Sequence, residues 1–281
     1  MQKIAPLYYS VSTQIEYRKL LGIGSQSEVI HVQNQRGEEY VVKRLLPQWS
    51  DHEHMQEQLL QEGRHLSLIS HSAIPKCMEI VDNGKQIMLL LEWISGSSLR
   101  RSIRFHKQNQ TWFSPLQIKQ WLSELAQTLM ICHRDINDEW GRPLHLIHGD
   151  LSPHNLIISV QDKSLKIIDW SSSLNGESPE YLKSLCTGKT SYLSPLRQEG
   201  HDPTQACDWY SLGIIGFELV VGKRPRFEFL NLPLKVKIKN LTKQGWPHSW
   251  AIWVSHLLSE YPEDRLEAVY HQRYFQTLES L

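Results

Sequence analysis

The first third of the chain alternates short apolar runs with polar turn residues, a pattern typical of β-strands. β-branched and aromatic residues gather in five such runs, at residues 15–23, 28–33, 40–45, 77–82 and 86–91. Between the third and fourth runs, residues 53–70 carry apolar side chains near helical spacing, among them Met55, Leu59 and Leu66. The pattern therefore predicts a strand-rich N-terminal part that contains one helix.

The character of the chain changes after the polar stretch Ser95-Gly96-Ser97-Ser98. Residues 116–133 and 208–222 are long segments that read as helices rather than strands. We predict a bilobal α+β fold. An N-terminal extension (residues 1–15) precedes a small antiparallel-sheet lobe with one helix (about 16–91). A hinge (about 92–98) then leads to a larger, mainly helical lobe (about 99–281).

Composition and charge narrow the function without identifying it. A chain of 281 residues can form one large domain or two closely packed lobes, and a 40% hydrophobic content is ordinary for a globular protein. The 30 basic and 30 acidic residues cancel, so electrostatics give no reason to expect binding to nucleic acid or to an anionic membrane. We therefore expect neither as a partner.

The N-terminus and the cysteines favour a cytoplasmic protein. The first ten residues, MQKIAPLYYS, lack the apolar stretch of a signal peptide, and the apolar runs at 87–91 and 212–221 are too short to span a bilayer. The four cysteines are widely spaced and form no CxxC pair, which predicts neither a disulfide framework nor a zinc site. Reduced cytosolic thiols are the simplest interpretation.

A glycine-containing turn, GIGSQSEV at residues 22–29, connects the first two predicted strands. Gly22 and Gly24 would let the backbone bend tightly and approach phosphate groups without a Cβ in the way. The motif alone fits an ordinary hairpin turn equally well. It is not a Walker loop, because no Gly-Lys-Ser/Thr follows it.

A lysine near the end of the third predicted strand, Lys43, has a candidate partner on the following helix. Such a lysine is commonly a solvated edge residue, but Glu62 on that helix offers a carboxylate. A buried pair of this kind would hold the ammonium group where it can bind the α- and β-phosphates of ATP.

The most specific motif is HGDLSPHN at residues 148–155. Asp150 and Asn155 lie five positions apart, a spacing that suits a carboxylate orienting an attacking hydroxyl beside an amide that binds Mg²⁺. The short strand predicted at 165–169 ends in Asp169, which could hold the metal that bridges the phosphates. An aspartate at a strand end is often only a turn former, but the whole ordered set is difficult to obtain by chance.

The order and spacing of these motifs resemble the protein-kinase superfamily over about residues 16–276, and in particular bacterial, eukaryotic-like Ser/Thr protein kinases. The resemblance implies a kinase-like domain over 16–281, with Asp150, Lys43 and Glu62 as catalytic residues and Asn155 and Asp169 as metal ligands. For the nucleotide, it implies contacts from Gly22, Gly24, Ser25, Ser27, Val29, Val41, Lys43, Glu92, Ile94 and Ile157.

Later segments extend the resemblance. Residues 188–196 resemble the end of an activation segment, the helix beginning near Asp208 resembles the one that anchors the catalytic loop, and Arg265 resembles a late structural arginine. His133-Arg134-Asp135 spells the usual catalytic triplet, but Trp140 stands where the metal-binding Asn would be. We therefore assign His133 to the end of the preceding helix.

Several positions depart from the family pattern. Gly149 replaces the arginine that precedes the catalytic Asp, which predicts activity without phosphorylation of the activation segment. Ser152 replaces a lysine that contacts the γ-phosphate. Leu196 replaces the glutamate that pairs with the late arginine, so Arg265 needs another partner or is solvated.

Three further departures concern the nucleotide site. Val41 replaces a small alanine and would narrow the adenine pocket. Asp169-Trp170-Ser171 stands for the usual Asp-Phe-Gly, and serine has less backbone freedom than glycine. Gly63, next to Glu62, weakens its helix by about 1 kcal/mol relative to alanine. We expect this to let the Lys43–Glu62 pair open easily.

The resemblance implies an active Ser/Thr protein kinase that uses ATP with Mg²⁺ or Mn²⁺ on a protein substrate, with autophosphorylation as one candidate reaction. Two alternatives stay open. One is a small-molecule phosphotransferase on a kinase-like fold, which the glycine before Asp150 slightly favours. The other is a nucleotide-binding pseudokinase or scaffold, which the altered motifs permit.

Overall fold

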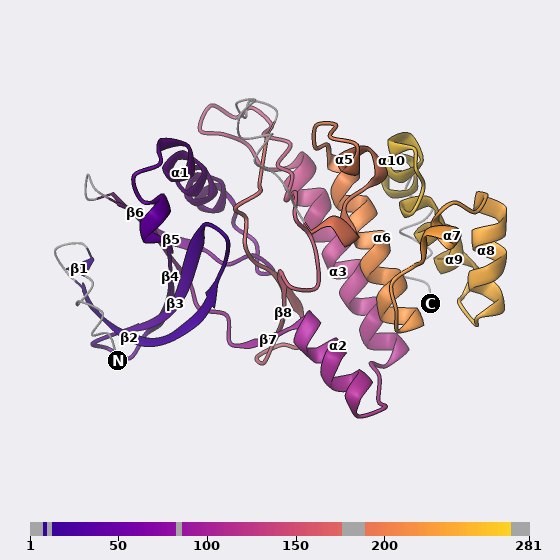
Figure 1. Cartoon of the computed structure of the whole chain (residues 1–281), viewed down its shortest axis with the longest axis horizontal. Helices are drawn as coiled ribbons and strands as arrows, with labels where there is room; N and C mark the ends of the chain where they lie inside the picture. The colour runs from indigo at the N-terminus through magenta and orange to yellow at the C-terminus, as the bar shows by residue number, and fades with distance from the viewer. Residues whose placement is uncertain (1–7, 10–12, 83–85, 176–188, 271–281) are drawn as a thin grey trace. The chain divides into compact units, whose positions relative to one another are not determined.

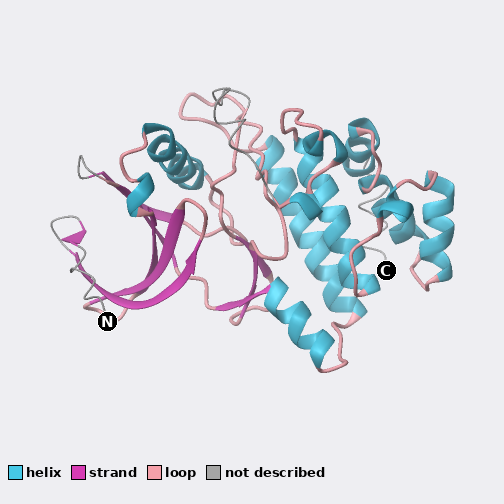
Figure 2. Ribbon diagram, viewed as in Figure 1, coloured by secondary structure: helices cyan, strands magenta, loops and turns pink. Residues whose placement is uncertain are grey.

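A computed structural model describes residues 8–9, 13–82, 86–175 and 189–270. The chain forms two compact units, drawn in Figures 1 and 2. The first comprises the chain up to Ser95 together with Ile168–Ser171, and the second comprises Gly96–Ile167 and the chain from Ser172 onward. The boundary after Ser95 falls inside the predicted hinge at 92–98.

The first unit is built on an antiparallel sheet of six strands in the order β1-β2-β3-β4-β6-β5. The five predicted strands are confirmed, and the structure adds the short β1. The bounds are β1 Tyr8–Tyr9, β2 Thr13–Ile23, β3 Ser27–Asn34, β4 Glu39–Leu45, β5 Cys77–Asp82 and β6 Ile87–Glu92. A 3-10 helix, η1 (Pro47–Trp49), follows β4.

The two faces of the sheet have different roles because side chains alternate along each strand. Ile30 pairs with Val42 and Val42 with Leu90, and these residues belong to a buried apolar cluster on one face. Lys43 pairs with Val29 on β3 and Leu89 on β6, so it lies on the opposite face. The register thus directs Lys43 away from the apolar cluster.

The predicted helix is α1 (Glu53–Leu68), which contacts β4, β5 and β6. Its glycine allows a close approach to the sheet: a Cβ on Gly63 would lie 2.6 Å from Leu89 Cδ2 and 2.9 Å from Ile80 Cδ1. That Gly63 lets the Lys43–Glu62 pair open easily stays a prediction, and the structure adds a packing role for this glycine. The glycine lets α1 pack closely against Leu89 and Ile80, which offsets its low helix propensity.

The second unit is mainly helical. Its helices are α2 Leu99–Gln108, α3 Pro115–Arg134, α5 Pro195–Gln198, α6 Gln205–Val221, α7 Phe227–Leu230, α8 Leu234–Lys243, α9 His248–Leu257 and α10 Pro262–Tyr270. The 3-10 helix η2 covers Thr190–Tyr192. A small antiparallel sheet joins β7 Gly96–Ser98, β8 Leu156–Ser159 and β9 Leu165–Ile167.

The two long predicted helices form the centre of this unit. α3 and α6 pack side by side (Figure 1), and α6 is buried along most of its length, which explains why its sequence is apolar on every face. A Cβ on Gly213 of α6 would lie 2.8 Å from Leu257 Cβ, so glycine also sets the α6–α9 approach. Within the described residues, none of the helices combines the length and hydropathy that crossing a bilayer requires.

Candidate functional site

The predicted site residues divide between the two units, and the first unit brings three of them together. Lys43 Nζ lies 2.7 Å from Glu62 Oε1 and 2.7 Å from Asp169 Oδ1. Lys43 is 4% exposed and Glu62 1% exposed. The sequence predicted the contact between Lys43 and Glu62, and the structure confirms it. Removing one partner of a buried pair costs about 3–5 kcal/mol, because the remaining charge is left uncompensated.

The two carboxylates keep the Lys43 ammonium charged. Burial by itself would lower the pKa of Lys43, but the charges of Asp169 and Glu62 and their hydrogen bonds outweigh that effect and raise it above its ordinary value. Lys43 therefore stays protonated at all physiological pH values.

The backbone around Asp169 is shaped by its own hydrogen bonds. Asp169 has a φ of +62°, in the left-handed region, and the N–H of Trp170 donates to Glu62 Oε1 at 3.1 Å. The Ser171 hydroxyl donates to Asp169 Oδ1 at 2.9 Å. Ser171 itself is not among the residues with positive φ, so the expected penalty for serine in place of glycine does not arise. The Trp170 side chain is fully buried.

The glycine-containing segment is a tight connection between β2 and β3. Gly24 N–H donates to Ser27 O at 2.8 Å, and Ser25 O accepts a hydrogen bond from Trp49 Nε1 at 2.9 Å. A Cβ on Gly22 would meet no atom within 4 Å. The protein's own packing therefore does not require glycine at that position.

The residues predicted to contact adenine lie on three elements. Val29 and Val41 share the sheet face of Lys43, and Glu92 ends β6 with its N–H donating to Lys76 O at 2.9 Å. Ile94 follows in the same unit. Ile157 lies on β8 of the second unit.

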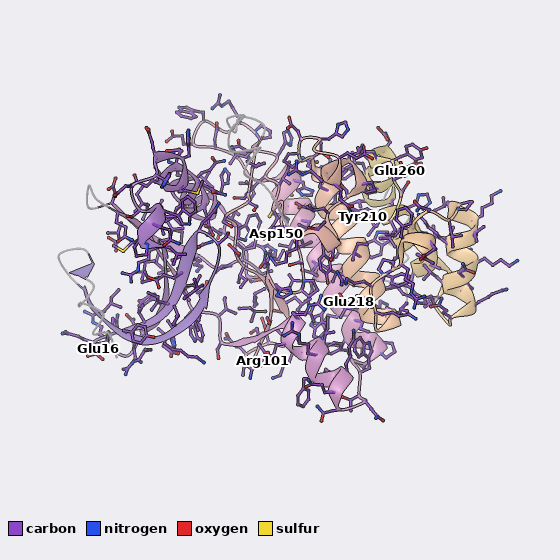
Figure 3. The ribbon with its side chains drawn as sticks, viewed as in Figure 1. Glu16, Arg101, Asp150, Tyr210, Glu218 and Glu260 are labelled. Atoms are coloured by element: carbon purple, nitrogen blue, oxygen red, sulfur yellow. The ribbon has the colours of Figure 1, made fainter. Side chains whose placement is uncertain are left out.

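The second unit places Asp150 and Asn155 in contact, and Asp150 is labelled in Figure 3. Asn155 Nδ2 donates to Asp150 O at 2.8 Å and to Asp150 Oδ2 at 2.9 Å. Lys189 adds a second interaction: its N–H donates to Asp150 Oδ1 at 2.7 Å, and its Nζ lies 2.6 Å from Oδ2. The Asp150 carboxylate is thus held by an amide on one side and an ammonium group on the other.

Lys189 is the site residue that sequence reasoning missed as a partner of Asp150. The sequence did contain a hint of this contact. It has a lysine at position 189, and it has Ser152 where the family has a lysine. Neither change identifies the contact alone, because it joins residues 39 positions apart. Ser152 is fully buried, and its hydroxyl has no hydrogen-bond partner in the part of the chain that the structure describes.

A buried aspartate on α6 holds the start of the segment at residues 148–155. Asp208 accepts hydrogen bonds from the N–H groups of His148 at 2.8 Å and Gly149 at 3.0 Å. His133 Nε2 lies 3.0 Å from the same carboxylate. The structure confirms that His133 belongs to the end of α3 and that the helix beginning near Asp208 anchors the loop. Gly149 has a φ of +80°, which explains the glycine in place of arginine.

Opposing effects set the pKa of Asp208. Burial would raise it, but the hydrogen bond and electrostatic interaction with His133, together with His148, lower the pKa below its ordinary value. Asp208 therefore stays ionised and keeps both loop N–H groups bound at neutral pH.

Arg265 binds backbone carbonyl groups in place of the glutamate that the family pattern suggests. Arg265 is fully buried and donates through Nη1 to Ser259 O at 2.6 Å and Glu260 O at 3.2 Å. The alternative that it is solvated was wrong. Glu218, on α6, pairs with Arg100 at 2.9 Å.

The predicted metal ligands offer oxygen atoms, which suit Mg²⁺. Asp169 supplies a carboxylate in the first unit, and Asn155 supplies an amide oxygen in the second. Within the described ranges, no group of three or more His, Cys, Asp or Glu side chains could hold a metal ion by itself. Cys186 and Gly188 lie outside the described residues. Cys77, Cys132 and Cys207 are free thiols.

Comparison with known proteins connects this geometry to a family. The profile of the protein kinase domain matches residues 15–267. The chain is 29% identical over 171 residues to Aurora/IPL1-related protein kinase 2 of Caenorhabditis elegans, covering 61% of this chain and 51% of the relative. It is 26% identical over 226 residues to the serine/threonine-protein kinase PknA of Mycobacterium tuberculosis, covering 77% and 48%. The chain spans about half the length of these curated relatives.

Proposed function

Because the chain belongs to the protein kinase domain family, we propose that it transfers the γ-phosphoryl group of ATP to serine or threonine hydroxyls of proteins, with Mg²⁺ as the metal. The observation that carries this proposal is Lys43 held between two carboxylates at 2.7 Å. Burying a lysine and a glutamate is costly. A fixed cation for the α- and β-phosphates accounts for that cost.

The remaining roles follow residue by residue. Glu62 orients Lys43. Asp150 accepts the hydrogen of the attacking hydroxyl and positions its oxygen for in-line attack. Asp169 and Asn155 would hold Mg²⁺, which when bound neutralises charge on the phosphate oxygens. The residues predicted for the nucleotide at the glycine turn, the strand face and β6 keep their proposed roles.

Lys189 supplies the positive charge that the family places two residues after the catalytic aspartate. That position is Ser152 here, and its buried hydroxyl cannot replace an ammonium group. The Lys189 ammonium group lies 2.6 Å from Asp150 Oδ2. It can therefore also contact the phosphoryl group as it transfers to the hydroxyl that Asp150 positions. A donor aimed at charge that develops in the transition state is worth about 10²–10³ in kcat.

Serine and threonine are preferred as acceptors because similar proteins such as PknA are named serine/threonine kinases. The glycine before Asp150, which favoured a small-molecule substrate, has a structural reason in its positive φ. The presence of Lys43, Asp150, Asn155 and Asp169 together argues against a pseudokinase.

Transfer from γ-labelled ATP to casein, myelin basic protein and the enzyme itself tests the proposal. We expect Lys43→Met and Asp150→Asn to lower transfer by at least about 10²-fold. Arg44→Met is the matched control, since it removes a neighbouring cation on β4 that pairs with Glu28 at 2.6 Å. Nucleotide binding without transfer to any protein would overturn the proposal and favour a pseudokinase. Transfer to small hydroxyl compounds alone would favour the other alternative.

A further inference from the structure

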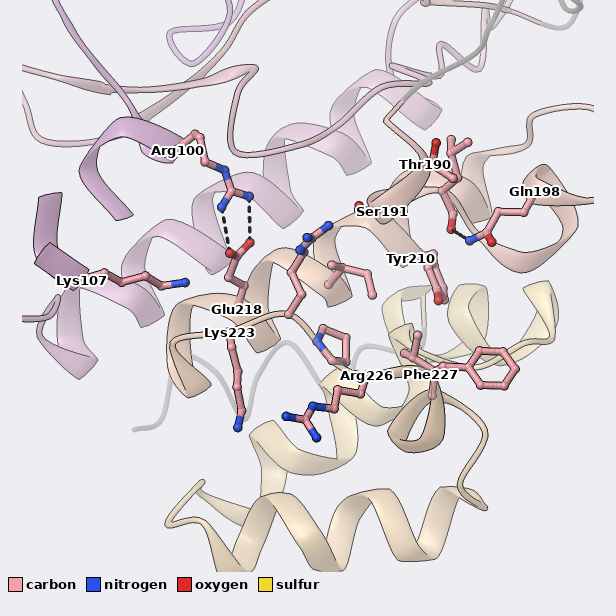
Figure 4. A pocket seen from close by; sticks show the side chains of 15 residues that line it. Arg100, Lys107, Thr190, Ser191, Gln198, Tyr210, Glu218, Lys223, Arg226 and Phe227 are labelled. Atoms are coloured by element: carbon pink, nitrogen blue, oxygen red, sulfur yellow. Dashed lines mark hydrogen bonds and ion pairs between the residues drawn. The ribbon is translucent and has the colours of Figure 1, made fainter. Parts of the chain in front are cut away.

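A cavity of about 610 Å³ lies in the second unit, between α2, η2, the end of α6 and the segment leading to α7. Figure 4 shows its lining. Basic residues dominate it: Arg100, Lys107, Lys223, Arg224 and Arg226. Glu218 is the single acidic residue among the lining residues, all of which the structure describes.

The carboxylate of Glu218 is already neutralised. Arg100 Nη1 and Nη2 approach its two oxygens at 2.9 and 3.1 Å, and the Tyr192 hydroxyl donates to Oε2 at 2.6 Å. Burial and Glu218 raise the pKa of Tyr192, so this hydroxyl stays protonated. A positively charged ligand would therefore meet no unpaired carboxylate in the cavity.

The other four cations are exposed and have no ion pair with any carboxylate in the described part of the chain: Lys107, Lys223, Arg224 and Arg226. Elsewhere in the protein, Arg44 and Lys166 each pair with a carboxylate at 2.6–2.7 Å. Three of the four cavity cations lie within residues 223–226. Uncompensated like charges at this density attract anions, and guanidinium groups bind carboxylates and phosphates in bidentate fashion.

The cavity begins next to the residue that contacts Asp150, Lys189. Thr190 and Ser191, which directly follow Lys189, line it. Two residues of extended chain span about 7 Å, so a peptide whose hydroxyl lies at Asp150 could reach the cavity within a few residues.

We propose that this cavity binds an acidic or phosphorylated side chain of the protein substrate, close in sequence to the hydroxyl that is phosphorylated. The inference rests on the proposed kinase function and adds a substrate class to it. A protein segment is favoured over nucleic acid because the chain as a whole has 30 basic and 30 acidic residues, so the positive charge is local. The exposed Phe227 ring provides apolar surface for a peptide beside the cations.

A peptide series with one acceptor serine tests this substrate class. Each flanking position in turn carries alanine, glutamate, phosphoserine or lysine, and kcat/KM is measured with purified enzyme. We expect glutamate or phosphoserine at one or two positions to raise kcat/KM about tenfold over alanine, mainly through KM, and lysine to lower it. The glutamate and phosphoserine arms separate a carboxylate ligand from a phosphate ligand.

A charge-removal variant locates the preference. Lys223→Ala/Arg224→Ala/Arg226→Ala is compared with Lys235→Ala/Lys239→Ala/Lys243→Ala, which removes three exposed lysines from α8 of the same unit. The ratio of acidic to alanine peptide is measured within each variant, so a general loss of activity cancels. We expect the ratio to fall toward one in the first variant only.

The failure modes are distinguishable. Peptides phosphorylated at equal rates would overturn the inference while the kinase function stands. Absence of transfer to every peptide would overturn the kinase function, and direct binding of fluorescent acidic peptide then tests the cavity alone. Single-stranded nucleic acid that binds as tightly as the acidic peptide would indicate a general polyanion surface and overturn the inference. Loss of the preference for acidic peptide in both triple variants would do the same.

Discussion

The contact between Lys189 and Asp150 leads to a prediction that separates catalysis from inhibition. If Lys189 replaces the lysine lost at Ser152, then Lys189→Met should lower kcat. Two unit charges about 4 Å apart interact by about 4 kcal/mol at an effective dielectric constant of 20. The Lys189 side chain is 37% exposed, so solvent screens part of this energy. We expect kcat to fall by about 10- to 100-fold, which corresponds to about 1.4–2.8 kcal/mol.

Steady-state kinetics with varied ATP provide the assay. Lys189→Arg keeps the charge and should retain most of the activity. The decisive variant is Lys189→Thr/Ser152→Lys, which returns the ammonium group to the position used by the family and should recover at least part of kcat. Thermal unfolding of each variant controls for damage at Ser152, which is a buried position. A rise in kcat on Lys189→Met would refute the reasoning, because the contact would then restrain Asp150 rather than assist it.

Four further predictions concern stability and regulation. Gly63→Ala should lower the free energy of unfolding by about 1 kcal/mol or more in urea, because overpacking against Leu89 outweighs the gain in helix propensity; a stabilised variant would contradict this. Gly149→Ala should lower the free energy of unfolding by about 1–2 kcal/mol, because alanine is strained at the positive φ of this position. It should also lower kcat, because the loop shifts. Urea unfolding and steady-state kinetics measure the two effects, and unchanged values would argue against the prediction. Burial lowers the pKa of His65 to about 4, so between pH 6.5 and 4 only the unfolded state binds this proton. The free energy of unfolding should therefore fall by up to about 2 kcal/mol from pH 7 to 5. His65→Leu should flatten this pH dependence, and an unchanged slope would exclude His65 as its source. Phosphatase treatment should leave activity intact, since Gly149 offers no guanidinium group to a phosphorylated segment; loss of activity would refute this.

Periodic and local features were predictable from the sequence. The strands at 15–23, 28–33 and 40–45 carried β-branched residues between turn signals, and their positions agree with the structure within two residues. α3 and α6 were evident because each is a long segment, α3 with apolar residues at helical spacing and α6 apolar along most of its length. The Lys43–Glu62 contact was predictable as a candidate, because the helix that follows the strand of Lys43 carries a carboxylate, and the resemblance gave the pair its role.

Long-range exchanges of partners could not be read from the sequence. Arg100 belonged to a basic cluster on a helix, and its buried partner Glu218 lies 118 positions away. Gly63 looked like a weak helix residue because the side chains that require it belong to β5 and β6. Lys189 and Ser152 each appeared as an isolated departure. These contacts depend on which helices and strands pack together in the folded protein. The local secondary-structure propensity of each residue carries no information about that packing.

The hydrogen bonds from the loop to Asp208 have a consequence for how the protein opens. His148 and Gly149 lie outside any helix or strand, and loop amides ordinarily exchange with solvent deuterium quickly. Here both N–H groups are bound to a carboxylate that is 1% exposed on the almost wholly buried α6. They can be released only when the packing around that helix opens. In hydrogen exchange these two amides should behave as members of α6, so this loop unfolds with the core of its unit.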